Sequence, residues 1–170
     1  MNDPDKPTDP GITLRDATEA DTGLILDFIR QLADYKKISD EVVADEETLR
    51  ASLFGGRQVA EVIIASWDGR PAGFALFFHN FSTFLGRSGV YLEDLFVIPE
   101  MRGKGIGQVL LSRLAQIAVE RGGGRFEWSV LDWNIDAIRF YERLGAKAMD
   151  GWTTYRVTGE ALEKLAGTSP

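Results

Sequence analysis

Residues 92–118, LEDLFVIPEMRGKGIGQVLLSRLAQIA, place a strand-like apolar run, a glycine-rich turn and an amphipathic helical pattern in direct succession. Glycines alternate with other residues in the turn, and the helix is expected from about residue 104 to residue 121. Glycine has no side chain to keep a ligand from the backbone, and a helix N-terminus presents unpaired N–H donors at the positive end of its dipole. We therefore interpret the turn, together with the cation of Arg102, as a pyrophosphate-binding site.

Two common phosphate-binding loops do not match this turn. A Walker A loop has Ser or Thr directly after its Gly-Lys pair and another glycine five positions before that pair, but Gly105 and Ile98 occupy these places. A dinucleotide-binding loop has the pattern G-x-G-x-x-G, but Gln108 and Leu110 occupy the possible positions of the third glycine. An alternative also stays open, in which the glycines only let the helix pack closely.

Length and composition narrow the class of protein. The 170 residues predict a single domain, residues 11–167, after a disordered, proline-rich leader at residues 1–10. No apolar run approaches the roughly 20 residues that span a bilayer, and there is no signal-peptide pattern, so we expect a cytoplasmic protein without membrane contact. The net charge of −7 argues against a nucleic-acid partner. The absence of cysteine excludes disulfides and thiolate metal sites, and we expect no metal.

The rest of the pattern is that of a mixed α/β chain, with antiparallel hairpins first and one β-α-β crossover later. Asp68 and Gly69 lie between two apolar runs, a strong signal for a two-residue hairpin. The segment from Thr18 to Asp21 fits a helix capping box. Further strands are expected at 12–15, 90–98, 125–131 and 153–157, and further helices at 45–53, 136–144 and 159–166.

Two motifs, in this order, resemble those of the GNAT superfamily of N-acetyltransferases. The first is Arg-x-x-Gly-x-Gly at residues 102–107, after a strand that ends in Val-x-Pro. The second is Asn-x-x-Ala-x-x-x-Tyr-x-x-x-Gly-Ala at residues 134–146. Longer stretches are similar to the diamine (spermidine/spermine) N-acetyltransferase family and its thialysine-acetylating relatives: RDATEAD, LADYKKISDEV, YLEDLFVIPEMRGKGIG and VLDWNIDAIRFYERLGA.

The resemblance implies the acyl-CoA N-acyltransferase fold, an α/β fold whose central mixed, mostly antiparallel twisted sheet has about seven strands flanked by helices. It also implies a homodimer that transfers acetyl from acetyl-CoA to the primary amine of a diamine, polyamine or lysine analogue. CoA would bind by its pantetheine arm along Leu95, Phe96 and Val97, by its pyrophosphate at Arg102, Gly103, Lys104, Gly105, Ile106, Gly107 and Gln108, and at the second motif through Asn134, Asp136, Ala137 and Tyr141.

Acetyl transfer requires a neutral amine, although a free alkylamine has a pKa of roughly 10, and a proton for the departing thiolate. The resemblance assigns the proton donor to Tyr141 and the base to Glu93, acting through water. Consecutive carboxylates in an apolar strand are costly unless they are paired, hydrated or used. We interpret Asp94 as structural, and the reverse assignment stays open. Strand alternation is expected to form one face from Tyr91, Glu93, Leu95 and Val97 and the other from Leu92, Asp94, Phe96 and Ile98.

The amine site implied by the resemblance is lined by Tyr35, Lys36, Glu93, Glu127, Trp128, Ser129 and Asp150. The chain departs from the polyamine enzymes at Lys36 and Lys37, because that family has acidic residues there. We therefore expect a compact amine that carries its own carboxylate, such as a lysine analogue, to fit better than spermidine. Two other functions stay open: a protein lysine or N-terminal acetyltransferase, and a non-catalytic acyl-CoA-binding module.

Overall fold

The structure, a computed structural model, describes residues 11–167, so the predicted leader at residues 1–10 lies outside the described residues. The chain divides into two compact units, of which the first ends at Ser129 and the second begins at Val130.

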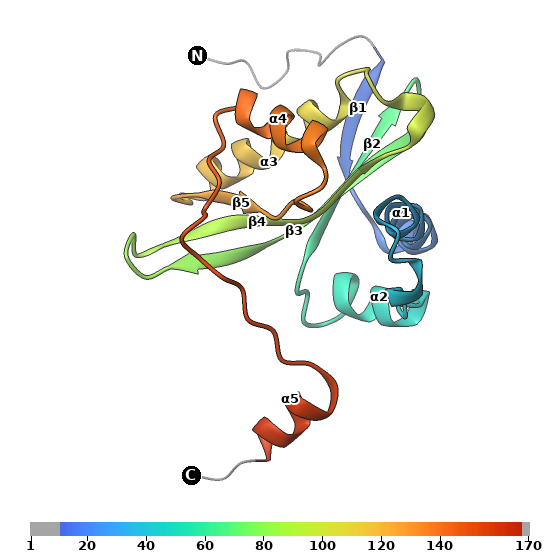
Figure 1. Cartoon of the computed structure of the whole chain (residues 1–170). Coiled ribbons are helices and arrows are strands. Elements are labelled where there is room, and N and C mark those ends of the chain that lie inside the picture. Colours follow the sequence, from blue (N-terminus) through green and yellow to red (C-terminus); the bar gives the residue numbers. More distant parts are fainter. Residues whose placement is uncertain (1–10, 168–170) are drawn as a thin grey trace. The chain divides into compact units, whose positions relative to one another are not determined.

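The first unit is built on a five-stranded sheet in which the strands follow their sequence order (Figure 1). The strands are β1 (Ile12–Asp16), β2 (Glu61–Trp67), β3 (Arg70–Ser82), β4 (Arg87–Val97) and β5 (Phe126–Trp128). The first four pair antiparallel, and β5 pairs parallel to β4. The predicted hairpin between β2 and β3 is confirmed: Asp68 and Gly69 both have positive φ, as a two-residue turn of this kind requires.

The expected strand count was wrong. About seven strands were expected, and the sheet has five within residues 11–167. Residues 153–157, expected to form the last strand, have no ladder of hydrogen bonds in that range. A run with β-forming residues becomes a strand only when a neighbour supplies this ladder, and the sequence of the run does not specify the neighbour.

Helices cover both faces of the sheet in the first unit. Helices α1 (Thr22–Lys36) and α2 (Glu46–Phe54) lie on one side, and α3 (Ile106–Glu120) lies on the other (Figure 1). The ring of Phe28 on α1 stacks on that of Phe74 on β3, with 5.5 Å between ring centroids. A buried core joins α1, α2 and this face of the sheet, formed by Ile25, Phe28, Leu32, Leu53, Val62, Ile64, Phe74 and Phe96.

The second unit contains α4 (Ile135–Arg143) and α5 (Gly159–Ala166). Both helices confirm the prediction, with α5 at the predicted bounds and α4 shifted by one residue toward the N-terminus. Gly145, with a φ of 88°, follows α4 in the left-handed conformation that commonly ends a helix.

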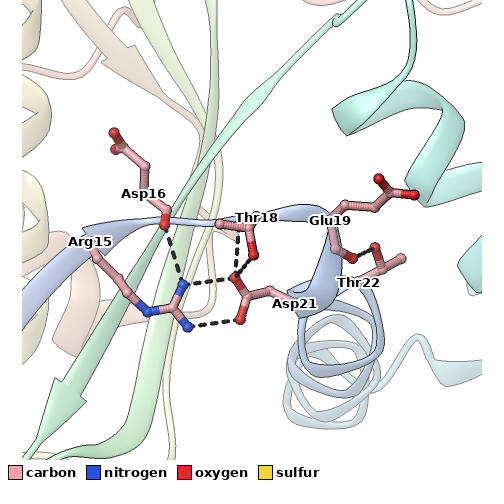
Figure 2. Close-up of polar contacts among 6 residues, drawn as sticks. All are labelled: Arg15, Asp16, Thr18, Glu19, Asp21 and Thr22. Atoms are coloured by element: carbon pink, nitrogen blue, oxygen red, sulfur yellow. Dashed lines mark hydrogen bonds and ion pairs between the residues drawn. The ribbon is translucent and has the colours of Figure 1, made fainter.

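A bidentate ion pair fixes the turn from β1 into α1 (Figure 2). The two terminal nitrogens of Arg15 each donate to one carboxylate oxygen of Asp21, both at 2.7 Å. The same carboxylate accepts the backbone N–H of Thr18 at 2.8 Å, which is the reach-back contact of the predicted capping box. One side chain therefore holds the strand and the start of the helix together.

Asp21→Asn is expected to lower the free energy of unfolding by about 1–3 kcal/mol at pH 7, because a charged hydrogen-bonded pair is lost. The Arg15 guanidinium holds the pKa of Asp21 well below its usual range. Because the pKa of Asp21 is lower in the folded state, its ionisation stabilises the folded protein fully at pH values above the unfolded-state pKa of about 4. This contribution is lost as the pH falls toward the folded-state pKa. Denaturant titration should therefore show the difference from wild type shrinking between pH 5 and pH 3. The exposed Asp27→Asn is the matched control, and a deficit equal at both pH values would contradict the assignment.

Candidate active site

The outer edge of β4 is unpaired over its second half. Strand β5 pairs only with residues 90–92 of β4, and no other described residue pairs with this side. The Ile98 N–H points back toward β3 and donates to the Ala72 carbonyl at 2.9 Å. Val97, one residue earlier, therefore directs its backbone N–H and C=O to the open edge, and alternation directs those of Leu95 the same way. At this edge Leu95 thus offers its N–H and C=O and Val97 offers its N–H, because the Val97 carbonyl already accepts from the Arg102 side chain. The ring of Phe96, the third residue predicted to run beside pantetheine, is buried in the core.

A β-bulge lies where β5 ends. Leu76 pairs with Asp94 and Phe77 pairs with Leu92, so Glu93 has no partner on β3. The alternation expected for this strand was therefore wrong, because the bulge shifts its phase by one residue. Directly paired residues share a face, so Leu92 lies on the face of Phe77 and Asp94 on the face of Leu76. Glu93 itself is exposed.

The two consecutive carboxylates have different surroundings. The Lys36 ammonium at the end of α1 binds Asp94 Oδ1 at 3.0 Å, and both side chains are partly buried, at 31% and 23% exposure. Tyr91 pairs with Phe78 on β3, and the two rings stack on each other. Phe78 lies two residues from Leu76, the partner of Asp94, so Tyr91 and Asp94 lie on the same face of the sheet. This ion pair agrees with the structural interpretation of Asp94 and leaves Glu93 as the exposed carboxylate.

The glycine turn is open above its backbone. Gly103 and Gly105 have φ values of 77° and 84°, and a Cβ added at either would meet no atom within 4 Å. The first N–H to bond back within α3 is that of Val109, which donates to the Gly105 carbonyl at 3.0 Å. The N–H groups of the three residues before Val109, at positions 106–108, therefore have no intrahelical acceptor. An exposed ledge with several donors fits a pyrophosphate.

Two cations flank the ledge, and each is held against an aromatic ring. The Lys104 ammonium lies 4.6 Å from the ring centroid of Trp67. The Arg102 guanidinium lies 4.8 Å from the centroid of Tyr35, and its Nε donates to the Val97 carbonyl at 3.0 Å. Arg102, predicted on the cofactor side, and Tyr35, predicted on the amine side, thus contact each other, which no local sequence signal indicates.

The β5 residues predicted for the amine site have polar partners within the first unit. Glu127 Oε2 accepts from Asn80 at 2.7 Å and pairs with Arg125 Nε at 2.9 Å. The Ser129 hydroxyl, where the chain leaves β5, bonds to the Tyr91 hydroxyl on β4 at 2.7 Å. Trp128 packs against Phe126, with 4.9 Å between ring centroids. Alternation placed Tyr91 on the face of Glu93, but the bulge puts Tyr91 on the face of Asp94, and its contact with Ser129 was not predicted.

The remaining predicted residues lie in the second unit. Asn134 caps α4, and its side-chain oxygen accepts the Ala137 N–H at 3.4 Å. Asp136 lies in the first turn of this helix, and Asp150 lies in the segment that follows it. Tyr141 is on α4 with its ring tilted against that of Phe140, at a centroid distance of 5.6 Å. The predicted roles of these side chains stay predictions.

Neither a metal site nor a membrane-spanning helix is present among the described residues. Among residues 11–167, no group of three or more His, Cys, Asp or Glu side chains is placed to hold a metal ion. Over that same range, each helix is too short or too polar to cross a membrane.

Residues 28–146 match the Acetyltransferase (GNAT) family, which places the glycine turn, the bulged strand and α4 within one known pattern. The chain belongs to the GNAT acetyltransferase family. A thialysine N-epsilon-acetyltransferase from Sus scrofa is 41% identical over 167 residues, which cover 92% of this chain and 98% of the relative. An L-ornithine N5-acetyltransferase from Arabidopsis thaliana is 32% identical, with 89% of this chain and 86% of the relative covered.

Solved structures agree with the family assignment. An integron cassette protein from the mobile metagenome of V. cholerae superposes with a TM-score of 0.79 at 28% identity, over 93% of this chain and 99% of that one. The predicted fold class is confirmed as a GNAT fold, with five strands among the described residues in place of about seven. As a GNAT acetyltransferase, the chain is an enzyme of acyl transfer rather than a structural module.

Proposed function

We propose that this GNAT acetyltransferase transfers acetyl from acetyl-CoA to the primary amine of a small molecule, a diamine or a lysine analogue, by direct attack. The observation that carries the proposal is the continuous open edge of β4. One end of this edge meets the exposed carboxylate of Glu93 at the bulge, and the other leads to the glycine ledge. Both ends lie in the first unit. The names of the relatives, for thialysine and ornithine, support an amino acid with a side-chain amine as the acceptor.

Acetyl-CoA, as the co-substrate, supplies the acetyl group as an activated thioester. The N–H donors of residues 106–108 and the Arg102 guanidinium would hold its pyrophosphate, since a helix N-terminus and a fixed cation both favour an anion. The outward backbone of Leu95 and Val97 would bind the pantetheine amides in the manner of a neighbouring strand. These groups position the thioester near the bulge, which is the entropic part of catalysis.

Two proton transfers are assigned to side chains. Glu93 takes a proton from the acceptor ammonium through water, because the amine attacks only when neutral. The amine nitrogen then forms a bond to the thioester carbonyl carbon, and the carbon–sulfur bond breaks. Tyr141 donates its hydroxyl proton to the departing sulfur, and the second proton that the nitrogen loses on forming the amide restores the Tyr141 hydroxyl.

Glu93→Gln is expected to lower kcat/KM at neutral pH and to shift the activity profile toward higher pH. There the free amine is already partly neutral, since its pKa is roughly 10, so the missing base matters less. The measurement is kcat/KM from pH 6 to pH 10 for wild type, Glu93→Gln and Asp94→Asn. A pH shift produced by Asp94→Asn and not by Glu93→Gln would transfer the role of base to Asp94.

The function itself is tested by thiol release from acetyl-CoA with a panel of acceptors: lysine, thialysine, ornithine, cadaverine, spermidine and lysine-containing peptides. We expect release with the small amines and little with the peptides. Release with peptides alone would favour a protein acetyltransferase, and CoA binding without release would favour a non-catalytic module. A cytoplasmic location is proposed from the composition and a homodimer from the sequence resemblance. Light scattering at micromolar concentration tests the dimer.

A further inference from the structure

We propose that the Lys36–Asp94 ion pair is a specificity element that binds the zwitterionic α-amino and α-carboxylate groups of the acceptor. This inference rests on the proposed function, and it identifies what binds the end of the acceptor that is remote from the reacting amine. It assigns the acceptor to the class of α-amino acids with a side-chain amine, and it assigns the discrimination against plain diamines to Lys36.

The Lys36–Asp94 ion pair lies close to the candidate base and is accessible to a ligand. Asp94 directly follows Glu93, and consecutive Cα atoms are 3.8 Å apart, so the ion pair lies within the length of a lysine side chain from the candidate base. Asp94 pairs with Leu76 and so lies on the face of the sheet that α1 covers, where Lys36 at the end of α1 reaches it at 3.0 Å. Both side chains keep some exposure, 31% for Lys36 and 23% for Asp94, so a ligand can contact the pair without breaking the core.

The opposite charges of Lys36 and Asp94 favour a ligand that carries both charges. A diamine bound at Glu93 would bring a second ammonium to a place where Asp94 attracts it and Lys36 repels it, so the net gain is small. A ligand with a carboxylate alone would be attracted by Lys36 and repelled by Asp94, so it also gains little. A zwitterion can place its ammonium by Asp94 and its carboxylate by Lys36, and each charge then has two opposite neighbours. Partly buried charges strengthen this preference, because water screens them less than at the open surface.

The chain also offers a matched control for the key cation. Lys37 is the next residue, is exposed, and ends α1 in the left-handed conformation with a φ of 60°. Among the contacts described for residues 11–167, an ion pair to a carboxylate is recorded for Lys36 and not for Lys37. Lys37→Met therefore removes the same charge from the same helix end without removing the Asp94 contact.

The experiment compares lysine with cadaverine, which has the same spacing of amines and lacks the carboxylate. We expect wild type to favour lysine in kcat/KM by about tenfold or more, the scale of one charged hydrogen bond. Lys36→Met should lower the lysine-to-cadaverine ratio roughly tenfold, mainly through the KM for lysine, while Lys36→Arg and Lys37→Met keep the preference. Thermal unfolding of each variant establishes that it is folded.

Several results would overturn the inference. If the wild-type enzyme acetylates cadaverine and lysine with equal kcat/KM, the inference is refuted before any variant is made. The proposed acetylation of a small amine would still stand. A ratio that falls equally in Lys36→Met and Lys37→Met would assign the effect to general charge. If Lys36→Met does not fold, the ratio in Lys36→Gln decides, and an unchanged ratio there refutes the role. Absence of thiol release with every amine would refute the proposed function itself.

Discussion

Tyr141→Phe is expected to bind CoA as the wild type does and to lose about 10²- to 10⁴-fold in turnover, the range for removal of a positioned general acid. The ring stays, so the packing of Tyr141 against Phe140 on α4 is kept and only the hydroxyl proton is lost. Calorimetry measures the CoA affinity, and single-turnover kinetics measure the acetyl-transfer step separately from product release.

Tyr155→Phe is the matched control for this variant. Tyr155 lies in the same unit, is 91% exposed, and has no assigned part in the chemistry, so its hydroxyl should be dispensable. If Tyr141→Phe transfers acetyl at a near-normal single-turnover rate, Tyr141 is not the proton donor. If Tyr141 protonates the departing sulfur, an acetyl thioester with a more basic thiolate should also show a larger loss of rate in Tyr141→Phe.

Gly105→Ala is expected to weaken CoA binding by about 10- to 100-fold, the scale of one or two charged hydrogen bonds to the pyrophosphate. The new Cβ would stand on the open ledge where the ligand is proposed to lie, and the φ of 84° would relax toward values that remove the N–H donors from their places. The backbone strain alone costs about 1–2 kcal/mol in stability.

Gly86→Ala separates the strain from the binding effect. Gly86 lies in the β3–β4 hairpin with a φ of 62°, and a Cβ there also meets no atom within 4 Å. Both variants should lose similar stability in denaturant titration, and only Gly105→Ala should lose CoA affinity. An unchanged CoA affinity in folded Gly105→Ala would remove the glycine turn from the cofactor site.

The parts of the fold that local chemistry specifies were predicted well. Asp68 and Gly69 tolerate positive φ, so the hairpin between β2 and β3 could be located from two residues. Gly145 marked the end of α4, and Asp45, whose carboxylate accepts the Thr48 N–H at 2.8 Å, marked the start of α2. Each of these signals acts within a few residues of the chain.

The parts that depend on a partner strand or a distant residue could not be predicted. The bulge at Glu93 arises in the pairing of β4 with β3, so the alternating sequence of β4 alone gave the wrong faces. The Lys36–Asp94 ion pair and the stacking of Arg102 on Tyr35 join the end of α1 to β4 and to the glycine turn. The sequence placed Lys36 in the amine site and favoured an acceptor with its own carboxylate, but it could not indicate that Asp94 is the partner of Lys36.

Direct acetyl transfer from acetyl-CoA to a small primary amine is tested most directly by a measurement that follows both products. The enzyme is incubated with acetyl-CoA that carries a trideuterated acetyl group and with lysine, and the products are followed by mass spectrometry together with free thiol. We predict labelled N-acetyl-lysine that forms in step with one equivalent of thiol and does so far more slowly with Tyr141→Phe. Thiol release without labelled amine, or label found on the protein in place of the amine, would contradict the account.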